Sequence, residues 1–464
     1  MTSSASPAGP IPAGDEQQSP HPAPAPARSI RPLAGVLAAT AVSVTGTRVS
    51  AVALPWFVLV TTGSAVQTGL VAFCEMTPYV LVKMFTGPLV DRVGPRVISW
   101  SADSLSAVAA ALIPALHAFG LLPFWLLLTL VAVIGAVRGP GDLAKEIMVP
   151  EAAERSRVPL ERATGLSGVT ERLASTVGPA AGGALVALLG PMAGLVVNAA
   201  SFVLGSLVIA LVLPRGMGGA VRPGDGDGHT SPDGSAAGEP AGYWRRFGEG
   251  FAFLRGEPLL LTVIVMVGIT NLIEAGFAAV LVPVWAERSG GGPAVIGLMS
   301  STSGIASVCG SLIAAALAHR MRRRPVFFAG FLLAGAPKFV VLACGAPLWA
   351  VLTVFALSGF GGGFLNPILG AVSFERVPRG LLGRVRALGD SLAWAGIPLG
   401  GLLAGLAVTS AGLVPVLLAS GALYFLTTNL AGLRPEWREM DRRRKDVRDG
   451  GEEFAAPREE ALQG

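Results

Sequence analysis

Five charged side chains lie inside long apolar stretches of this sequence. They are Arg48, Glu75, Asp103, Glu274 and Lys338. A charge in hydrocarbon is costly, so such groups generally face a cavity or a partner and are candidates for binding a proton or a substrate. Because a carboxylate can gain and lose a proton, Glu274 is the first choice for a proton carrier.

Arg48 and Glu274 stand near the middles of the first and seventh predicted spans. Because these two spans belong to opposite halves of the protein, the two residues predict either a pair across a central cavity or separate substrate and proton sites. For Glu274 the alternative is a fixed structural pair that never titrates. Lys338 can equally extend its amine toward the membrane surface or pack between helices.

A second set of candidate residues forms a short polar connection that runs from Gly87 through Asp91, Arg92 and Gly94 to Arg96. Glycines permit close helix approach and a tight turn, and arginines hold a loop in the cytoplasm. Asp91 can bind basic partners, or the positive end of a helix, in one conformation and release them in another. The connection therefore predicts a conformational switch.

Further gating candidates lie near the same ends of the predicted spans. Arg138 is either a partner for Asp91 or only a marker of topology, and Asp390 is a gating candidate in the second half of the chain. In the fifth predicted span, Gly178, Pro179 and Gly182 predict a bend and a close helix contact. Simple packing is the alternative for those three residues.

The composition indicates which elements must position these residues. Hydrophobic residues make up 52% of the chain and charged residues only 14%, against about a quarter charged in soluble domains. Apolar runs near the length of a transmembrane helix recur, and the short alternating segments of a β-barrel are absent. We therefore predict an all-α membrane protein. The three cysteines and four histidines show no metal or disulfide spacing, so no metal and no cofactor are predicted.

Twelve spans are predicted, and the connections between them alternate in charge. Basic connections favour the cytoplasm, which places both termini there. The basic residues thus report orientation, and no nucleic-acid partner is predicted. The predicted spans are 33–60, 67–90, 98–117, 121–141, 164–188, 192–213, 258–285, 293–317, 326–344, 348–370, 385–409 and 412–432.

An internal repeat divides the chain into two halves. Five landmarks recur at a spacing of 228 residues, which indicates a duplication and a cavity between two six-span halves. They are Pro55 and Pro283, Gly69-Leu70 and Gly297-Leu298, Arg92 and Arg320, Gly135 and Gly363, and Val149-Pro150 and Val377-Pro378. The predicted units are a disordered tail (1–29), a six-helix bundle (30–214), a linker with an amphipathic helix (215–256), a second bundle (257–433) and a charged tail (434–464).

The connection at residues 87–96 resembles the signature loop of the major facilitator superfamily, and residues 178–183 resemble a motif of its drug exporters. Ala53-Leu-Pro-Trp56 with Thr62-Gly-Ser-Ala65, residues 250–254 and the loop at 377–385 are similar to exporters of the macrolide-efflux and enterobactin-exporter kind. The sequence departs from that branch at Pro88 and at Ser106. The latter stands where an arginine partner for Asp103 is expected.

The resemblance implies an exporter of amphiphilic or lipophilic small molecules in a bacterial inner membrane, exchanging them for protons and acting as a monomer. Two alternatives stay open: a nutrient importer on the same fold, and a membrane sensor that transports nothing. An ATP-driven pump is disfavoured because no P-loop is present, and an enzyme because no catalytic constellation is found.

Overall fold

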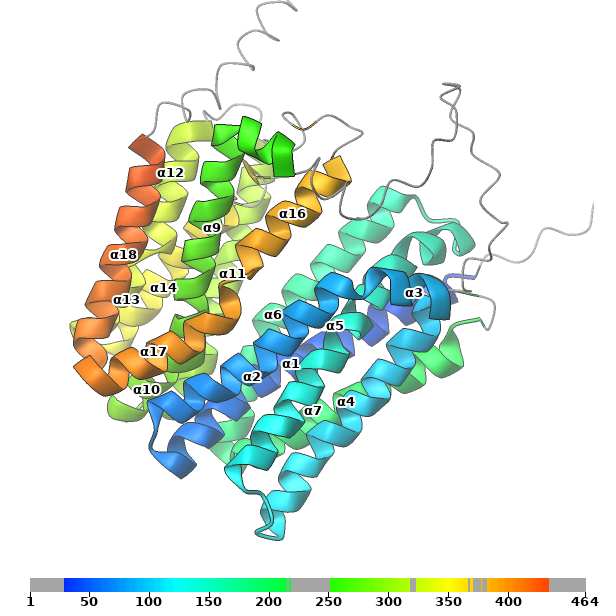
Figure 1. Ribbon diagram of the computed structural model, residues 1–464, viewed down its shortest axis with the longest axis horizontal. Coiled ribbons are helices and arrows are strands. Elements are labelled where there is room, and N and C mark those ends of the chain that lie inside the picture. Colours follow the sequence, from blue (N-terminus) through cyan, green and yellow to red (C-terminus); the bar gives the residue numbers. More distant parts are fainter. Residues whose placement is uncertain are drawn as a thin grey trace, which may run out of the picture.

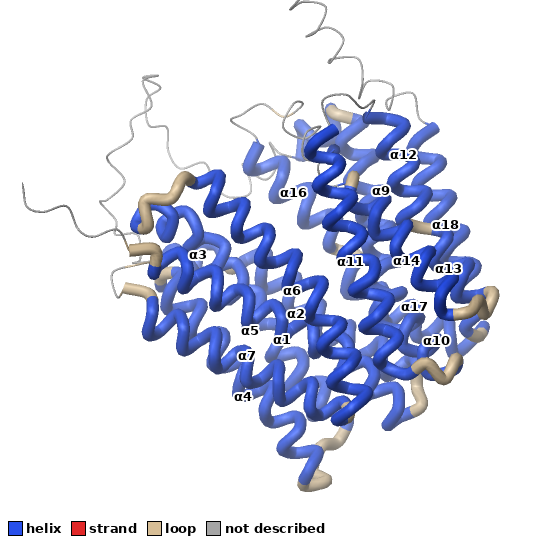
Figure 2. The backbone as a smooth tube through the Cα atoms, turned by 180° about the vertical axis from the view of Figure 1, so that it is seen from behind, coloured by secondary structure: helices blue, strands red, loops and turns tan. Residues whose placement is uncertain are grey.

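The computed structural model describes residues 29–214, 217, 251–317, 323–365, 368, 369, 377 and 382–433. Within these ranges the chain is helical without any strand (Figures 1 and 2). Eleven spans are long and apolar enough to cross a membrane, and the shorter helix α14, Leu348–Gly363, occupies the remaining predicted position. The predicted fold class, twelve transmembrane helices in two bundles, is therefore confirmed.

The N-terminal bundle consists of six long helices and one short helix after the second of them. Helices suit hydrocarbon because they satisfy their own backbone hydrogen bonds. The bounds are α1 Arg31–Thr62, α2 Ala65–Phe85, α3 Gly87–Val93, α4 Pro95–Ala118, α5 Phe124–Arg155, α6 Leu160–Leu189 and α7 Pro191–Val212. Helix α5 extends well beyond the predicted end at residue 141, which places Lys145 inside a helix and not in a loop.

The C-terminal bundle has three spans that are built from more than one helical segment. Its bounds are α9 Pro258–Gly276, η1 Phe277–Leu281, α10 Val282–Arg288, α11 Gly292–Leu317, α12 Arg323–Ala334, α13 Ala336–Ala343, α14, α16 Leu382–Trp394, α17 Ile397–Ala411 and α18 Leu413–Leu433. Residues 251–256 are also helical; the rest of the predicted amphipathic helix lies outside the described residues, as do Asn366 and Pro367.

Prolines account for these interruptions. A proline follows shortly after each interruption. Pro283 follows the π-helical turn η1, Pro337 follows the break at Gly335, and Pro398 follows the turn at residues 395 and 396. Proline lacks the N–H that would continue the ladder of hydrogen bonds, so the preceding turn widens or opens. The widened turn η1 begins three residues after Glu274 and sets the direction of that span beside the charged side chain.

The two bundles repeat the same packing of second against fourth span. Gly135 of α5 lies against the carbonyl of Glu75 in α2, and Gly363 of α14 lies against that of Ser307 in α11. An added Cβ atom would collide with the neighbouring backbone at either glycine. Since these glycines are 228 residues apart in the sequence, the close approach of the helices is a shared feature of the repeat.

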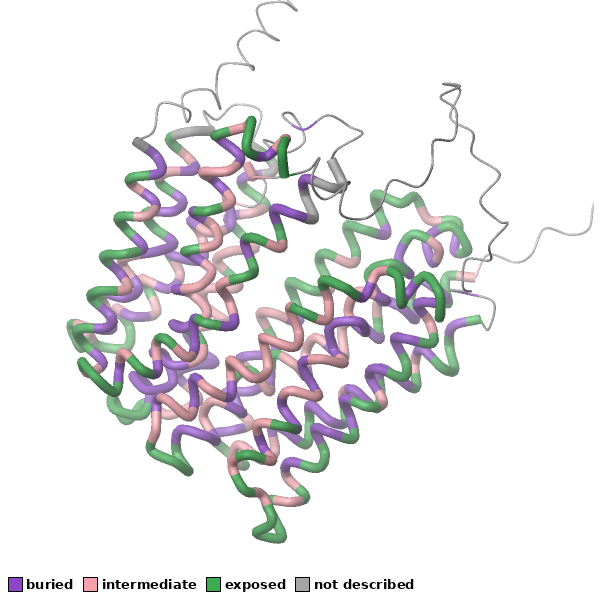
Figure 3. The backbone as a smooth tube through the Cα atoms, viewed as in Figure 1, coloured by how far each residue is buried: buried purple, intermediate pink, exposed green. Residues whose placement is uncertain are grey.

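The bundles touch each other through backbone contacts at one end of the molecule. Gly183 of α6 packs on Gly297 of α11, and Gly69 of α2 packs on Gly401 of α17. Figure 1 shows the bundles converging near α10 and separating toward α3 and α12. Most exposed residues lie on the outer surfaces of both bundles, whereas buried residues face other helices (Figure 3), as expected of a protein surrounded by lipid.

Candidate functional site

A cavity of about 440 Å³ lies within the C-terminal bundle and is lined entirely by its residues. The sequence predicted a cavity between the two halves; this cavity is a different one, and the prediction stays a prediction. Small hydroxyl side chains and two aromatic rings form the lining together with one pair of opposite charges. Those lining groups include Thr270, Ser300, Ser303, Ser307, Ser358, Phe331, Tyr424, Glu274 and Lys338.

The charged pair of this cavity is Glu274 of α9 and Lys338 of α13. The Lys338 Nζ donates to both carboxylate oxygens, at 2.5 and 2.6 Å. Its side chain is 10% exposed and that of Glu274 is 35% exposed, so the carboxylate is the more accessible partner. The Lys338 Nζ also lies over two aromatic rings, 5.0 Å from the centre of the Phe277 ring and 5.6 Å from the centre of the Phe339 ring. A ligand entering the cavity therefore meets Glu274 first.

The break between α12 and α13 at Gly335 positions Tyr424 and Lys338 in the cavity lining. The ring of Tyr424 in α18 occupies the space where a side chain at residue 335 would lie. Pro337 prevents α12 from continuing, and the new helix α13 then directs Lys338 toward α9. Local sequence thus positions the cation, while Glu274 comes from a span 64 residues earlier.

The N-terminal bundle contains a ladder of polar pairs between α2 and α5. Arg138 donates to Glu75 at 2.8 Å, Tyr79 to Asp142 at 3.4 Å, and Lys83 to Glu146 at 3.2 Å. Each pair is separated by 63 residues. The three partners on each helix are four residues apart and therefore share one face.

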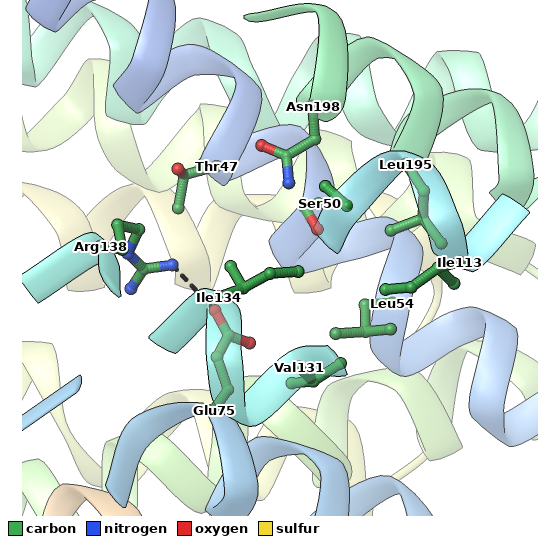
Figure 4. Close-up of a pocket in the computed structure, with 11 residues that line it drawn as sticks. Thr47, Ser50, Leu54, Glu75, Ile113, Val131, Ile134, Arg138, Leu195 and Asn198 are labelled. Carbon is green, nitrogen blue, oxygen red and sulfur yellow. Dashed lines mark hydrogen bonds and ion pairs between the residues drawn. The ribbon is translucent and has the colours of Figure 1, made fainter. Parts of the chain in front are cut away.

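Arg138 lies at the centre of this ladder. Its guanidinium is 4.5 Å from the centre of the Tyr79 ring, and its Nε is 3.7 Å from an oxygen of Asp142. In this structure Arg138 is thus paired with Glu75 and lies near Asp142, and it makes no ion pair with Asp91, which was one of its two predicted roles. Figure 4 shows Arg138 and Glu75 directed toward one another from two helices.

Asp103 of α4 forms a separate buried pair with Lys145 of α5. The distance is 2.8 Å, and the two side chains are 3% and 4% exposed. Ser43 of α1 donates a further hydrogen bond to the carboxylate at 3.2 Å. Ser106 stands where an arginine partner for Asp103 was expected, and Lys145 of another helix provides the basic partner instead.

We expect Asp103→Asn to destabilise the protein strongly. The change leaves the Lys145 ammonium buried without its counter-charge, which costs about 3–5 kcal/mol for a buried pair. Glu146→Gln is the matched control. It removes an acid of the ladder between α2 and α5, whose side chain is 65% exposed and whose ion pair is worth about 0–1 kcal/mol. Thermal unfolding in lipid nanodiscs measures both. Equal midpoints for the two variants would contradict this role of the buried pair.

The predicted switch residues lie on and around α3. Gly94 ends α3, and its N–H donates to the carbonyl of Val90. Its φ is 94°, an angle that a residue with a side chain would adopt only with strain. Arg96 donates to the carbonyl of Ala210 in α7 at 2.8 Å. Asp91 and Arg92 are exposed, and Asp91 makes no ion pair with any residue that the structure describes. An added Cβ atom at Gly87 meets open space, so close packing does not require that glycine here.

Arg48 and the motif of the fifth span meet at the contact between α1 and α6. Gly178 lies against the Cβ of Arg48, and Gly182 lies against the backbone of Val49. The Arg48 side chain is exposed and makes no hydrogen bond or ion pair within the described part of the chain; Arg138 and Glu171 are among its charged neighbours. Arg48 and Glu274 are thus not paired in this structure, and they belong to separate groups of residues.

The remaining predicted gating residue, Asp390, lies exposed on α16, one helical turn before Trp394. The Lys83 ammonium of α2 rests 5.5 Å from the Trp394 ring, which joins the two bundles away from their glycine contacts. Asp142, Lys145 and Glu146 were missed as site residues. For Asp142 and Glu146 the signal was the matching spacing of four residues in α2 and α5, with opposite charges at two of the three positions; Lys145 has no such signal.

Two duplicated bundles with charged groups buried at their centres define a polytopic membrane transporter. The sequence profile described as Major Facilitator Superfamily matches residues 36–288 and 264–458. This chain belongs to that family. Membership also confirms the prediction that it is a transporter and not an enzyme.

Individual relatives agree with this assignment. The chain is 34% identical to the multidrug efflux pump Tap of Mycobacterium tuberculosis over 413 residues, which covers 88% of this chain and 94% of Tap. It is 22% identical to the macrolide efflux protein A of Streptococcus pyogenes over 88% of this chain and 96% of that protein. A mutant of the nucleoside transporter NupG has the same fold, with a TM-score of 0.69 at 12% identity over 88% of this chain and 100% of NupG.

Proposed function

We propose that this transporter exports amphiphilic or lipophilic small molecules from the bacterial cytoplasm in exchange for protons. The observation that carries the proposal is the 440 Å³ cavity whose lining is apolar and hydroxylated except for Asn271 and the Glu274–Lys338 pair. Such a lining accommodates a largely apolar molecule and offers it one carboxylate. The names of the relatives, a multidrug efflux pump and a macrolide efflux protein, support this substrate class.

Transport would proceed by alternating access. We propose that both termini are cytoplasmic in the inner membrane, so the end that carries the basic connections faces the cytoplasm. The glycine contacts then close the outer end, and the two bundles would rock about them. Asp91, Arg92, Gly94, Arg96 and Asp390 would make and release contacts during that motion. The cavity is lined by residues of a single chain, which supports a monomer.

Glu274 would couple export to protons. Its carboxylate is bound by Lys338 in the present structure, and a proton or a cationic substrate group would compete with that ammonium for the same oxygens. Protonation would remove the negative charge that holds α9 to α13. The coupling would therefore act through the wall of the cavity itself.

The first test is accumulation of a panel of dyes and antibiotics in an efflux-deficient bacterium that expresses the chain. We expect lower accumulation of some compounds, and a protonophore should abolish that difference. Asp91→Asn should slow export by weakening the switch, at unchanged expression. Greater uptake of any compound in the expressing cells would contradict export and favour the importer.

A further inference from the structure

A small polar cavity lies inside the N-terminal bundle, apart from the cavity described above. It offers about 10 Å³ to a water molecule and is lined by residues of five helices, and this volume is at the lower limit of what one ordered water requires. Figure 4 shows its polar side, formed by Thr47, Ser50, Glu75, Arg138 and Asn198. The other side is apolar.

Three of these lining groups have a polar atom without a hydrogen-bond partner within the described residues: Arg138 at its Nε, Asn198 and Ser50. Asn198 is 3% exposed, and its Oδ1 is buried without a partner. The hydroxyl of Ser50 makes no hydrogen bond to another described residue. A buried amide without a partner costs free energy, and an internal water normally satisfies such a group. The cavity therefore has both the size and the unpaired polar atoms that an ordered water requires.

Glu75 borders this cavity with a carboxylate that is only partly engaged. One oxygen accepts from Arg138 at 2.8 Å, and the other points away from that guanidinium (Figure 4). The side chain is 23% exposed, so Glu75 reaches both the internal cavity and the outside of the bundle. This position suits a group that receives a proton from water.

Arg138 has a second carboxylate within reach. Asp142 lies 3.7 Å from its Nε, compared with 2.8 Å between Glu75 and the nearer nitrogen. If Glu75 loses its charge, Arg138 can move toward Asp142 with only a small shift. Asp142 is also 4.0 Å from Lys145, which binds Asp103. Any movement of Arg138 thus changes the ion pairs that join α2, α4 and α5.

Several other charged or titratable groups lie on the elements around Glu75. Helix α2 also carries Cys74, Tyr79 and Lys83. Helix α1 carries Arg48, whose charged neighbours are Arg138, Asp142 and Glu171. Helix α4, which lines the cavity, carries His117 and Asp103, and Lys145 binds Asp103. The other elements near this stretch of α2, namely α7, α17 and η1, contain no charged residue. Arg138 is therefore the cation on which the charge of Glu75 chiefly depends.

We infer that Glu75 is a second proton-binding residue, supplied through an ordered water in this cavity, and that its protonation transfers Arg138 from Glu75 to Asp142. Proton binding at Glu75 is a property of the folded chain. Its contribution to export rests on the function proposed above.

Difference infrared spectroscopy of the full chain in nanodiscs, between acidic and alkaline buffer, tests the proton site without any substrate. We expect a protonated-carboxyl band that Glu75→Gln lacks and that Glu146→Gln retains. Asp142→Asn should reduce this band at a given acidic pH, because Arg138 loses its other acceptor. If Glu75→Gln does not fold, Arg138→Lys is the second variant, and it should enlarge the band by loosening the hold on Glu75.

A matched pair of threonine substitutions tests the water. Thr47→Val and Thr129→Val each replace a hydroxyl that donates to the carbonyl four residues earlier, but only Thr47 lines the cavity. We expect slower hydrogen–deuterium exchange of the band in Thr47→Val alone. Equal exchange in both variants would contradict supply through the cavity.

The outcomes separate this inference from the proposed function. In proteoliposomes that export a substrate, Glu75→Gln should lower the number of protons exchanged per substrate by one. If no compound is exported but the band depends on Glu75, the proposed function fails and the proton site stands. If the band persists in Glu75→Gln, or if Glu75→Gln leaves the proton ratio unchanged, Glu75 is not a coupling residue.

Discussion

We expect proton-driven export to fall at least about tenfold in Glu274→Gln, an effect equivalent to about 1.4 kcal/mol or more in the transport barrier. Glutamine keeps the size of the side chain but can neither gain nor release a proton. It also leaves Lys338, which is 10% exposed, without its counter-charge. Because the carboxylate is 35% exposed, screening by water reduces the cost of that unpaired charge below that of a fully buried pair.

The double variant Glu274→Gln with Lys338→Met decides between a carrier and a structural pair. If the pair only supports the fold, removing both charges should restore stability and export together, since the penalty arises from the single unpaired ion. If Glu274 carries the proton, the double variant should recover its thermal midpoint but not its export. Glu287→Gln, which changes an exposed acid at the far end of the same span, should export like the wild type. Restored export in the double variant would eliminate Glu274 as the carrier.

Gly183→Val should open the end of the molecule at which the two bundles meet. An added Cβ atom at residue 183 would lie 2.7 Å from the carbonyl oxygen of Pro293 and 2.9 Å from the Cα of Gly297. Both are backbone atoms of the opposite bundle and cannot rotate away. Overpacking of this kind costs about 1–3 kcal/mol, which shifts a two-state equilibrium about 5- to 150-fold. The conformation with this end closed should therefore be depopulated, and export should fall.

Spin labels at Thr62 and Ser410, introduced after replacement of the native cysteines, would report the separation of the bundles at this end. We expect longer distances in Gly183→Val. The matched control is Gly168→Val on the same helix, where an added Cβ atom has nothing within 4 Å, and its distances should equal those of the parent. Unchanged distances in Gly183→Val would show that the contact between α6 and α11 does not hold this end closed.

Most of the fold could be predicted from the sequence, and the helix ends could be predicted less well. Apolar runs near the bilayer thickness define spans almost independently of their neighbours. Helix α5 shows the limit: its polar residues after position 141 predicted a loop, yet the helix continues to Arg155. Lys145 is tolerated there because it pairs with Asp103 of α4. Asp142 is tolerated because Tyr79 of α2 donates to it and Arg138, one turn earlier in α5, lies beside it.

The sequence by itself determined the membrane class, the duplication and most of the charges inside the spans, although Lys145 was missed. Those properties follow from hydropathy, which is local, and from the cost of placing an ion in hydrocarbon. Only the tertiary structure decided which charges meet. Glu274 pairs with Lys338 and not with Arg48, Arg138 with Glu75 and not with Asp91, and Asp103 with Lys145. The physical reason is that an ion pair depends on helix rotation and on distances of a few ångströms, which glycine contacts and proline breaks set between segments far apart in the chain.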